Sequence, residues 1–281
     1  MDDVITFRRA AWAALTYAGV LSLSAGLASA QSLVSTGQSF VEASLIPGET
    51  APDGSRTMGL ALDLAPGWKT YWRSPGEAGI PPRFDWEGSG NLARIEVLWP
   101  APGIYQSFGM TTIGYESDVV LPIRLEPEDA SAPVLVSLAL DLGVCREICV
   151  FERVELSANY APDVVAGAEA VATAVAAVPP PGAALGLTNA TCSIRGSGED
   201  RDFSAALTFD EPLYGATVLL EGPEDVWFHG THSWMEGDDI LIDATATLLF
   251  DDVWITRKDV RMTVLADGFA ADIQGCLAPG G

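Results

Sequence analysis

Between residues 40 and 160 the sequence consists of short runs in which apolar and polar residues alternate, separated by turns rich in Gly, Pro and Asp. Alternation with a period of two places successive side chains on opposite faces of a β-strand. The clearest runs are Ser39–Leu45, Met58–Leu64, Val119–Leu125 and Val134–Leu140. Runs of this kind, separated by such turns, predict an antiparallel β-sandwich over residues 31–160.

The C-terminal part of the chain returns to this pattern after a change in composition. Residues 161–178 are rich in Ala and Val and are followed by Pro179-Pro180-Pro181-Gly182, which predicts a short helix and a Pro-rich linker over residues 161–182. Alternating runs then follow at Leu187–Ile194, Phe203–Phe209, Thr217–Glu221, Ile240–Leu249, Val260–Leu265 and Phe269–Ile273. We therefore expect an all-β protein of two antiparallel β-sandwiches, the second over residues 183–281.

The first thirty residues have the features of a secretory signal peptide. Arg8 and Arg9 precede an uncharged stretch that ends in the small residues Ala28-Ser29-Ala30. We expect cleavage before Gln31 and export to the periplasm. The alternative is an uncleaved membrane anchor, because about 20 apolar residues can span a bilayer. After residue 30 no apolar run is long enough to do so.

The charge of the chain excludes one class of partner. It has 38 Asp and Glu against 15 Lys and Arg, a formal charge of -23. A nucleic-acid-binding protein needs a basic face that displaces counterions from phosphates, and the Lys and Arg residues form no such cluster. We therefore expect no nucleic-acid partner, and anionic lipid surfaces are disfavoured for the same reason.

The four cysteines divide into two pairs of different spacing. Cys192 and Cys276 lie in the predicted first and last strands of the second sandwich, and a bridge between them would stabilise the fold by roughly 4.6 kcal/mol through chain entropy. We expect this bridge to be structural. A bridge between Cys145 and Cys149 closes a much shorter loop and gives only about 2 kcal/mol before strain. Short, strained bridges are the more reducible ones.

Three other interpretations of Cys145 and Cys149 remain open from the residues alone. They could form a structural disulfide in a hairpin, remain as two buried thiols, or bind a metal together with His229 and His232. The two histidines are expected in a loop of the second sandwich. They are the only histidines of the chain, and no Ser or Cys elsewhere has a recognisable base beside it, so a hydrolytic triad is not supported.

Several motifs in the first half resemble one known family in combination. They are the segment Gly67–Pro82 (GWKTYWRSPGEAGIPP), the segment Trp99–Pro102 (WPAP), Ser107-Phe108-Gly109, and the pair Cys145 and Cys149. In this order and at comparable spacing they resemble the N-terminal periplasmic domain of DsbD-type disulfide reductases, in particular its ScsB-like branch. The resemblance covers residues 38–158.

The resemblance implies a fold and a chemistry. The family domain is an immunoglobulin-like β-sandwich whose cysteine pair exchanges reducing equivalents with other proteins, so Cys145 and Cys149 would be the redox pair. Phe108 and Gly109 would belong to a cap loop that covers this pair. Thiol–disulfide exchange requires no metal or organic cofactor. The sequence contains neither the transmembrane nor the thioredoxin-like module of the family, so we expect a separate thioredoxin-like or membrane protein as electron donor and periplasmic disulfide-containing proteins as acceptors.

Two rival functions remain open. In the first, the sandwich is a binding protein with a structural Cys145–Cys149 bridge that uses an aromatic surface, although core packing is the other explanation of these side chains. The aromatic residues concerned are Trp68, Tyr71, Trp72, Trp86 and Trp99. In the second, the protein handles copper through its cysteines and histidines. Whether the protein is an enzyme, a thiol:disulfide oxidoreductase, depends on which interpretation holds.

Overall fold

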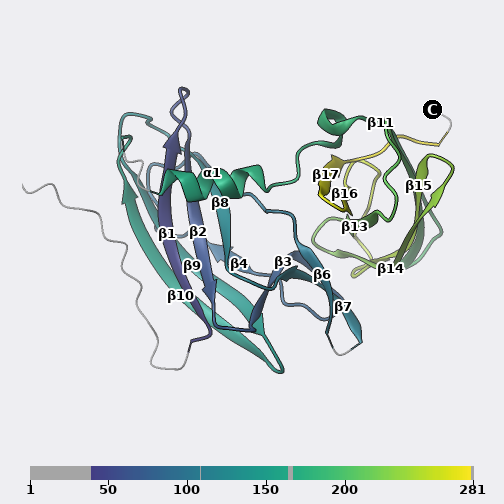
Figure 1. Cartoon of the computed structure of the whole chain (residues 1–281), viewed down its shortest axis with the longest axis horizontal. Coiled ribbons are helices and arrows are strands. Elements are labelled where there is room, and N and C mark those ends of the chain that lie inside the picture. Colours follow the sequence, from purple (N-terminus) through teal and green to yellow (C-terminus); the bar gives the residue numbers. More distant parts are fainter. Residues whose placement is uncertain (1–38, 108, 164–166, 280–281) are drawn as a thin grey trace, which may run out of the picture.

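A computed structural model describes residues 39–107, 109–163 and 167–279 (Figure 1). The predicted signal peptide and Phe108 lie outside the described residues. The chain is all-β, with antiparallel sheets and one α-helix among the described residues. None of its described helices is long and apolar enough to cross a membrane.

The N-terminal half, residues 39–160, contains two antiparallel sheets. One has the strand order β1-β2-β8-β5, and the other has the order β10-β9-β3-β7-β6 with β4 paired to β9. The strands are β1 (Val41–Thr50), β2 (Arg56–Leu64), β3 (Lys69–Gly76), β4 (Arg83–Asp85), β5 (Arg94–Val97), β6 (Gly103–Ser107), β7 (Met110–Tyr115), β8 (Val119–Glu126), β9 (Val134–Cys145) and β10 (Cys149–Tyr160). The four strands predicted in this half are present as β1, β2, β8 and β9.

The two sheets of this half share one hydrophobic core, and alternation along the strands builds it. On β9 the side chains buried in this core are Val134, Val136, Leu138, Leu140, Leu142 and Val144, each at most 1% exposed. Residues of β1, β2 and β8 from the opposite sheet complete the same cluster. Because β9 presents every second residue to this core, the side chains between them lie on the outer face of the second sheet.

A helix and a short 3-10 segment follow the first half. Helix α1 (Ala168–Ala176) lies within the predicted helical region and packs against β1, β2 and β8, with Val171 buried (Figure 1). The segment η1 (Gly182–Leu185) follows the proline run.

The C-terminal half also contains two antiparallel sheets around a core of its own. The sheets have the orders β11-β12-β15-β14 and β13-β16-β17. The strands are β11 (Leu187–Arg195), β12 (Asp200–Phe209), β13 (Thr217–Glu221), β14 (Val226–Glu236), β15 (Asp239–Leu248), β16 (Arg261–Ala266) and β17 (Phe269–Gln274). Cys192 on β11 is disulfide-bonded to Cys276. Cys276 was expected in the last strand but lies two residues after β17 ends.

The loop predicted around the two histidines is wrong. His229 and His232 lie on β14, an edge strand, and their rings stack on Trp227 and Trp234, with centroids 4.7 and 5.2 Å apart. The pairing with β15 shifts register between the histidines, at Gly230 and Thr231. This bulge breaks the period of two, which is the pattern on which strand prediction depends.

Candidate redox site

The hairpin of β9 and β10 carries the closely spaced cysteine pair at its tip. Cys145 is the last residue of β9 and Cys149 the first of β10; they face each other in register and are disulfide-bonded. The three residues between them form a tight turn, in which the Arg146 amide donates to the Ile148 carbonyl at 3.0 Å. Cys145 is only 8% exposed, whereas Cys149 is exposed. The two sulfurs therefore differ in access to a partner from solution.

A phenol from the neighbouring strand β3 reaches both sulfurs. Lys69 on β3 faces Cys145 in register, so Tyr71, two residues later, lies on the same outer face of the sheet. The Tyr71 hydroxyl donates a hydrogen bond to Cys145 Sγ at 2.8 Å and lies 3.5 Å from Cys149 Sγ. Tyr71 is buried, and this burial raises the pKa of its phenol. The hydroxyl therefore keeps its proton and remains a donor at neutral pH.

Two glycines leave the space that the Tyr71 ring occupies, and a third lies against the Tyr71 backbone. A Cβ on Gly143 of β9 would lie 3.2 Å from Tyr71 Cε2 and 2.8 Å from Ile80 Cβ. A Cβ on Gly79 would lie 2.9 Å from Tyr71 Cδ1, and one on Gly114 of β7 would lie 2.9 Å from Tyr71 Cα. The ring is thus packed between β9 and the segment that follows β3. Its hydroxyl has little freedom to leave the sulfurs.

Two cationic side chains near the pair, Lys69 and Arg146, are already engaged. Lys69 pairs with Glu116 and lies 4.1 Å from the centroid of the Tyr105 ring. In the turn, the Arg146 guanidinium lies 5.9 Å from the centroid of the Trp68 ring. The hydroxyl of Tyr71 is therefore the polar group that contacts the sulfurs directly, while the nearby cations are partnered by a carboxylate or a ring.

The exposed sulfur is bordered by apolar side chains that face solvent. Ile148 is 65% exposed and Phe151 is 73% exposed, large values for such side chains. Beside the turn an open hollow of about 540 Å³ is lined by apolar residues and by the turn itself. Its lining residues are Phe40, Ala65, Pro66, Trp68, Arg146, Glu147 and Ile148. This surface suits a partner that presents apolar side chains next to a sulfur.

The structure describes all but one of the predicted site residues. Cys145 and Cys149 are joined, and so are Cys192 and Cys276, far away in the C-terminal half. Gly109 lies in the turn between β6 and β7, where Ser107 faces Met110 in register, and has a φ of 80° that favours glycine. Its partner in the predicted cap loop, Phe108, lies outside the described residues.

The aromatic residues proposed as a binding surface are mostly core residues. Trp68 and Trp72 are buried in the core of the N-terminal half, and Trp86 and Trp99 pack against it. Tyr71 is the exception, because it lies outside this cluster and contacts the sulfurs. The sequence singled it out only as an aromatic residue. Alternation along the strand could have placed Tyr71 on the same face as Lys69. The sequence does not, however, give the register of this strand against Cys145.

The histidines and cysteines do not come together. His229 lies on β14, where its Nε2 is 3.0 Å from Thr247 Oγ1, and all four cysteines are in disulfides. Across the described ranges, no group of three or more His, Cys, Asp and Glu side chains is arranged to hold a metal ion. The arrangement offers no support for the metal interpretation.

Part of the chain matches a known protein family. Residues 42–160 match the family described as "Thiol:disulfide interchange protein DsbD, N-terminal". This matched segment is similar to the DsbD N-terminal domain over the N-terminal half of the chain. The family includes proteins of thiol–disulfide exchange, which agrees with a cysteine pair that lies close enough to form a disulfide. A search of curated proteins found no match.

A solved structure resembles most of the chain. The crystal structure of the N-terminal periplasmic domain of ScsB from Proteus mirabilis has a TM-score of 0.69 and 24% sequence identity, and the match covers 89% of this chain and 98% of that one. The covered share exceeds the segment matched by the DsbD family, so the likeness in fold continues into the C-terminal half. At this identity the comparison establishes the fold.

Proposed function

We propose that this protein exchanges thiols and disulfides with other proteins in the periplasm, using Cys145 and Cys149 as its redox pair. The observation that carries the proposal is the unequal environment of the two sulfurs in a DsbD-family domain: Cys149 is exposed, and Cys145 is buried against the hydroxyl of Tyr71. The predicted signal peptide and the periplasmic ScsB domain of similar fold support the location.

Reduction of the disulfide begins at the exposed sulfur. A thiolate of the donor protein attacks Cys149 Sγ, the bond between the two cysteines breaks, and Cys145 leaves as a thiolate. The Tyr71 hydroxyl then donates to a full negative charge, and such charge-assisted bonds are roughly twice as strong as neutral ones. The donor's second thiolate then attacks the donor sulfur that is bonded to Cys149. This step releases Cys149 as a thiolate and leaves the donor with an internal disulfide. Two electrons have moved, and no cofactor is required.

Transfer to an acceptor follows the same path in reverse. The Cys149 thiolate attacks the disulfide of the acceptor and forms a mixed disulfide, while one acceptor thiolate departs. Cys145 then attacks Cys149 Sγ, which restores the internal disulfide and releases the acceptor as a dithiol. Ile148 and Phe151 border the reacting sulfur and supply the apolar contact area for donor and acceptor in turn. A thioredoxin-like or membrane donor and disulfide-containing acceptors fit this role.

The proposal also assigns a role to each part of the chain. Residues 31–160 form the redox sandwich, of immunoglobulin-like type as the family resemblance implies, and residues 161–182 form the linker. Residues 183–281 form the second sandwich, whose Cys192–Cys276 bridge is structural. It joins β11 to the segment after β17 and closes a long loop.

Trapping of mixed disulfides tests the proposal. Cys145→Ser retains the exposed sulfur but removes the resolving one, so we expect it to accumulate mixed disulfides in periplasmic extract. Cys149→Ser should trap far less, because Cys145 is buried. Cys192→Ser/Cys276→Ser with an intact redox pair is the control and should trap none. If neither single variant traps a partner, the pair is a structural bridge and the function is refuted.

The reduction potential of the pair gives a second test that requires no partner. Structural disulfides typically lie below about -300 mV. We expect the Cys145–Cys149 pair to be reduced at a clearly higher potential than this in a glutathione or dithiothreitol buffer, as an exchanging pair must be. A value in the structural range would contradict the proposal.

A further inference from the structure

The sheet β13-β16-β17 has a second buried face, which is turned toward the N-terminal half (Figure 1). Val218 and Leu220 of β13 point into the core of the C-terminal half. Leu219, between them, belongs instead to the hydrophobic cluster of the N-terminal half, and Leu265 of β16 packs against that cluster. The alternation of the strands thus gives this sheet one face for its own core and one for the other half.

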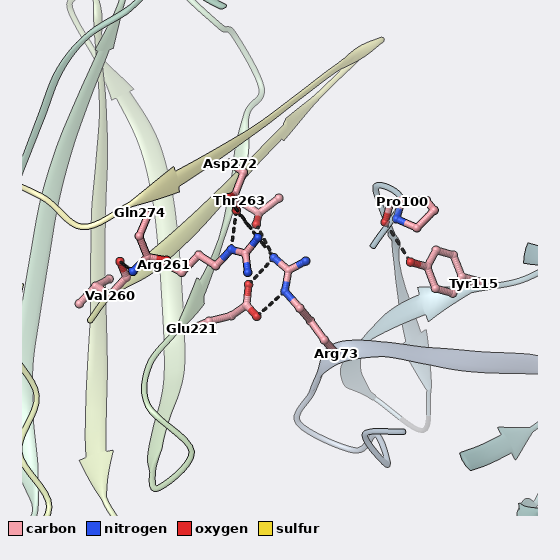
Figure 2. Close-up of polar contacts among 9 residues, drawn as sticks. All are labelled: Arg73, Pro100, Tyr115, Glu221, Val260, Arg261, Thr263, Asp272 and Gln274. Carbon is pink, nitrogen blue, oxygen red and sulfur yellow. Dashed lines mark hydrogen bonds and ion pairs between the residues drawn. The ribbon is translucent and has the colours of Figure 1, made fainter. Parts of the chain in front are cut away.

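An arginine of the N-terminal half enters this face. Arg73 of β3 binds Glu221 in a bidentate pair, with Nε to Oε1 and Nη2 to Oε2 both at 2.8 Å (Figure 2). Its Nη2 also donates to Thr263 Oγ1 at 3.3 Å and lies 3.8 Å from Asp272 Oδ1. Asp272 is held in turn by Arg261, with Nε to Oδ1 at 2.7 Å. Two guanidinium groups and two carboxylates therefore balance in charge.

The Arg73–Glu221 pair at the centre of this network is largely removed from water. The side chains of Arg73 and Glu221 are each 14% exposed, and the Arg73 guanidinium lies 3.7 Å from the centroid of the Trp72 ring. Removing one member of such a pair leaves an uncompensated charge that is poorly hydrated. The contact is therefore a strong and directional connection between the halves, unlike an exposed ion pair.

The position of Arg73 in the strand connects this network to the redox site. Arg73 lies two residues after Tyr71, in a stretch where β3 leaves the sheet ladder: its pairing with β7 stops at Tyr71 and resumes only at Gly76. The segment that follows then covers the Tyr71 ring, as the tight approach of Gly79 to Tyr71 Cδ1 shows. Backbone pairing does not fix this stretch, so its side-chain contacts must do so.

We propose that Arg73 is a positioning residue through which the C-terminal half holds the Tyr71 hydroxyl at the redox sulfurs. The proposal rests on the function proposed above and assigns the C-terminal half a part in it. When the Arg73–Glu221 pair is broken, the stretch after Tyr71 loosens and the Tyr71 hydroxyl spends less time on Cys145 Sγ. The thiolate of Cys145 then loses its donor, and the pKa of this thiol rises.

The test measures this thiol directly. In the Cys149→Ser background, Cys145 is the one thiol of the redox pair, and the pH dependence of its alkylation by iodoacetamide reports its pKa. We expect Arg73→Gln and Glu221→Gln each to raise that midpoint by about half a unit, which lowers the thiolate fraction at neutral pH about threefold. Arg73→Lys, which keeps the charge but loses the bidentate geometry, should give part of the shift.

A matched control and a second background separate positioning from simple destabilisation. Asp141→Asn breaks an exposed pair with Arg153 on the hairpin that carries the cysteines and should leave the midpoint unchanged. In a Tyr71→Phe background, Arg73→Gln should cause no further shift, because the group it positions is absent. Equal shifts in both backgrounds, or no shift in folded Glu221→Gln protein, would overturn the proposal. If Arg73→Gln does not fold, Glu221→Gln and Arg73→Lys carry the test.

The outcomes also separate this inference from the proposed function. Alkylation of Cys145 requires no partner protein, so the midpoint can shift even where no mixed disulfide is ever trapped. Failure of trapping with a shifted midpoint would refute the function alone. Successful trapping with unchanged midpoints would refute the role of Arg73 alone.

Discussion

At the scale of single residues, the polar partner of the Cys145 and Cys149 sulfurs is Tyr71. Its hydroxyl contacts Cys145 at 2.8 Å, and the phenol is buried among glycines that admit its ring. An uncharged donor whose pKa is raised by burial stabilises a thiolate without pairing permanently with it as a cation would. In the proposed exchange, this arrangement favours departure of Cys145 and leaves the exposed Cys149 as the sulfur that partners attack.

Tyr71→Phe removes only this hydroxyl. A hydrogen bond to a charged group contributes about 1.5–3 kcal/mol, so we expect the pKa of the Cys145 thiol to rise by about one to two units. Stability of the oxidised protein should fall by only about 1 kcal/mol, because a neutral bond is lost. Alkylation against pH and urea unfolding measure the two effects. An unchanged thiol pKa would show that the contact has no role in the chemistry.

At the scale of elements, the candidate redox site depends on how closely β3, β9 and the segment after β3 approach one another. Cys145 and Cys149 are fixed by the register of the β9–β10 hairpin, whereas Tyr71 comes from a different strand. Gly143 on β9 is a point of close approach, because a side chain there would meet both Ile80 and the Tyr71 ring. A backbone position thus controls the distance between the phenol and the sulfurs.

Gly143→Ala tests that control. Its Cβ would lie 2.8 Å from Ile80 Cβ, so we expect overpacking to destabilise the protein by about 1–3 kcal/mol and to displace the Tyr71 ring. The thiol pKa of Cys145 should rise in the same direction as in Tyr71→Phe. Gly103→Ala on β6 is the control, because its Cβ would meet the nearest atom at an ordinary 3.6 Å. Equal unfolding midpoints for the two variants would contradict the packing argument.

At the scale of the whole molecule, two hydrophobic cores are joined by a face that is apolar at Leu219 and Leu265 and ionic at Arg73 and Glu221.

The C-terminal half has its own core and its own disulfide. We expect the variant Cys192→Ser/Cys276→Ser to lose stability, because a bridge across a sequence separation of 84 residues removes roughly 4.6 kcal/mol of chain entropy from the unfolded state. Thermal and urea unfolding measure the loss. Unfolding like that of the parent would show that the bridge contributes little.

Alkaline pH probes burial in the sheet β10-β9-β3-β7-β6 of the N-terminal half. Burial raises the pKa of Tyr71, Tyr105, Tyr115 and Tyr160 above the ordinary tyrosine value of about 10. Above that pH the unfolded chain releases phenol protons that the folded chain keeps, so the free energy of unfolding falls as pH rises. We expect these tyrosines to ionise together with unfolding when tyrosinate absorbance and circular dichroism are followed. Their ionisation in a protein that remains folded would contradict the burial.

The sequence by itself determined the local structure and the chemical type of the site. Alternation along residues such as Val134–Leu140 predicted strands because one face of each is buried, and the combined motifs indicated the DsbD family and its cysteine pair. The histidine strand was missed because the bulge at Gly230 and Thr231 breaks the alternation on which such prediction depends.

Only the tertiary structure decided which residues meet. The contact of Tyr71 with Cys145 joins strands 74 residues apart, and that of Arg73 with Glu221 joins positions 148 residues apart. Alternation with a period of two tells which face of a strand a side chain occupies. It contains no information about the register between strands that are distant in sequence, or about which sheet packs against which. Those depend on packing of the complete cores, and so the donor to the sulfurs and the connection between the halves became visible only in the folded chain.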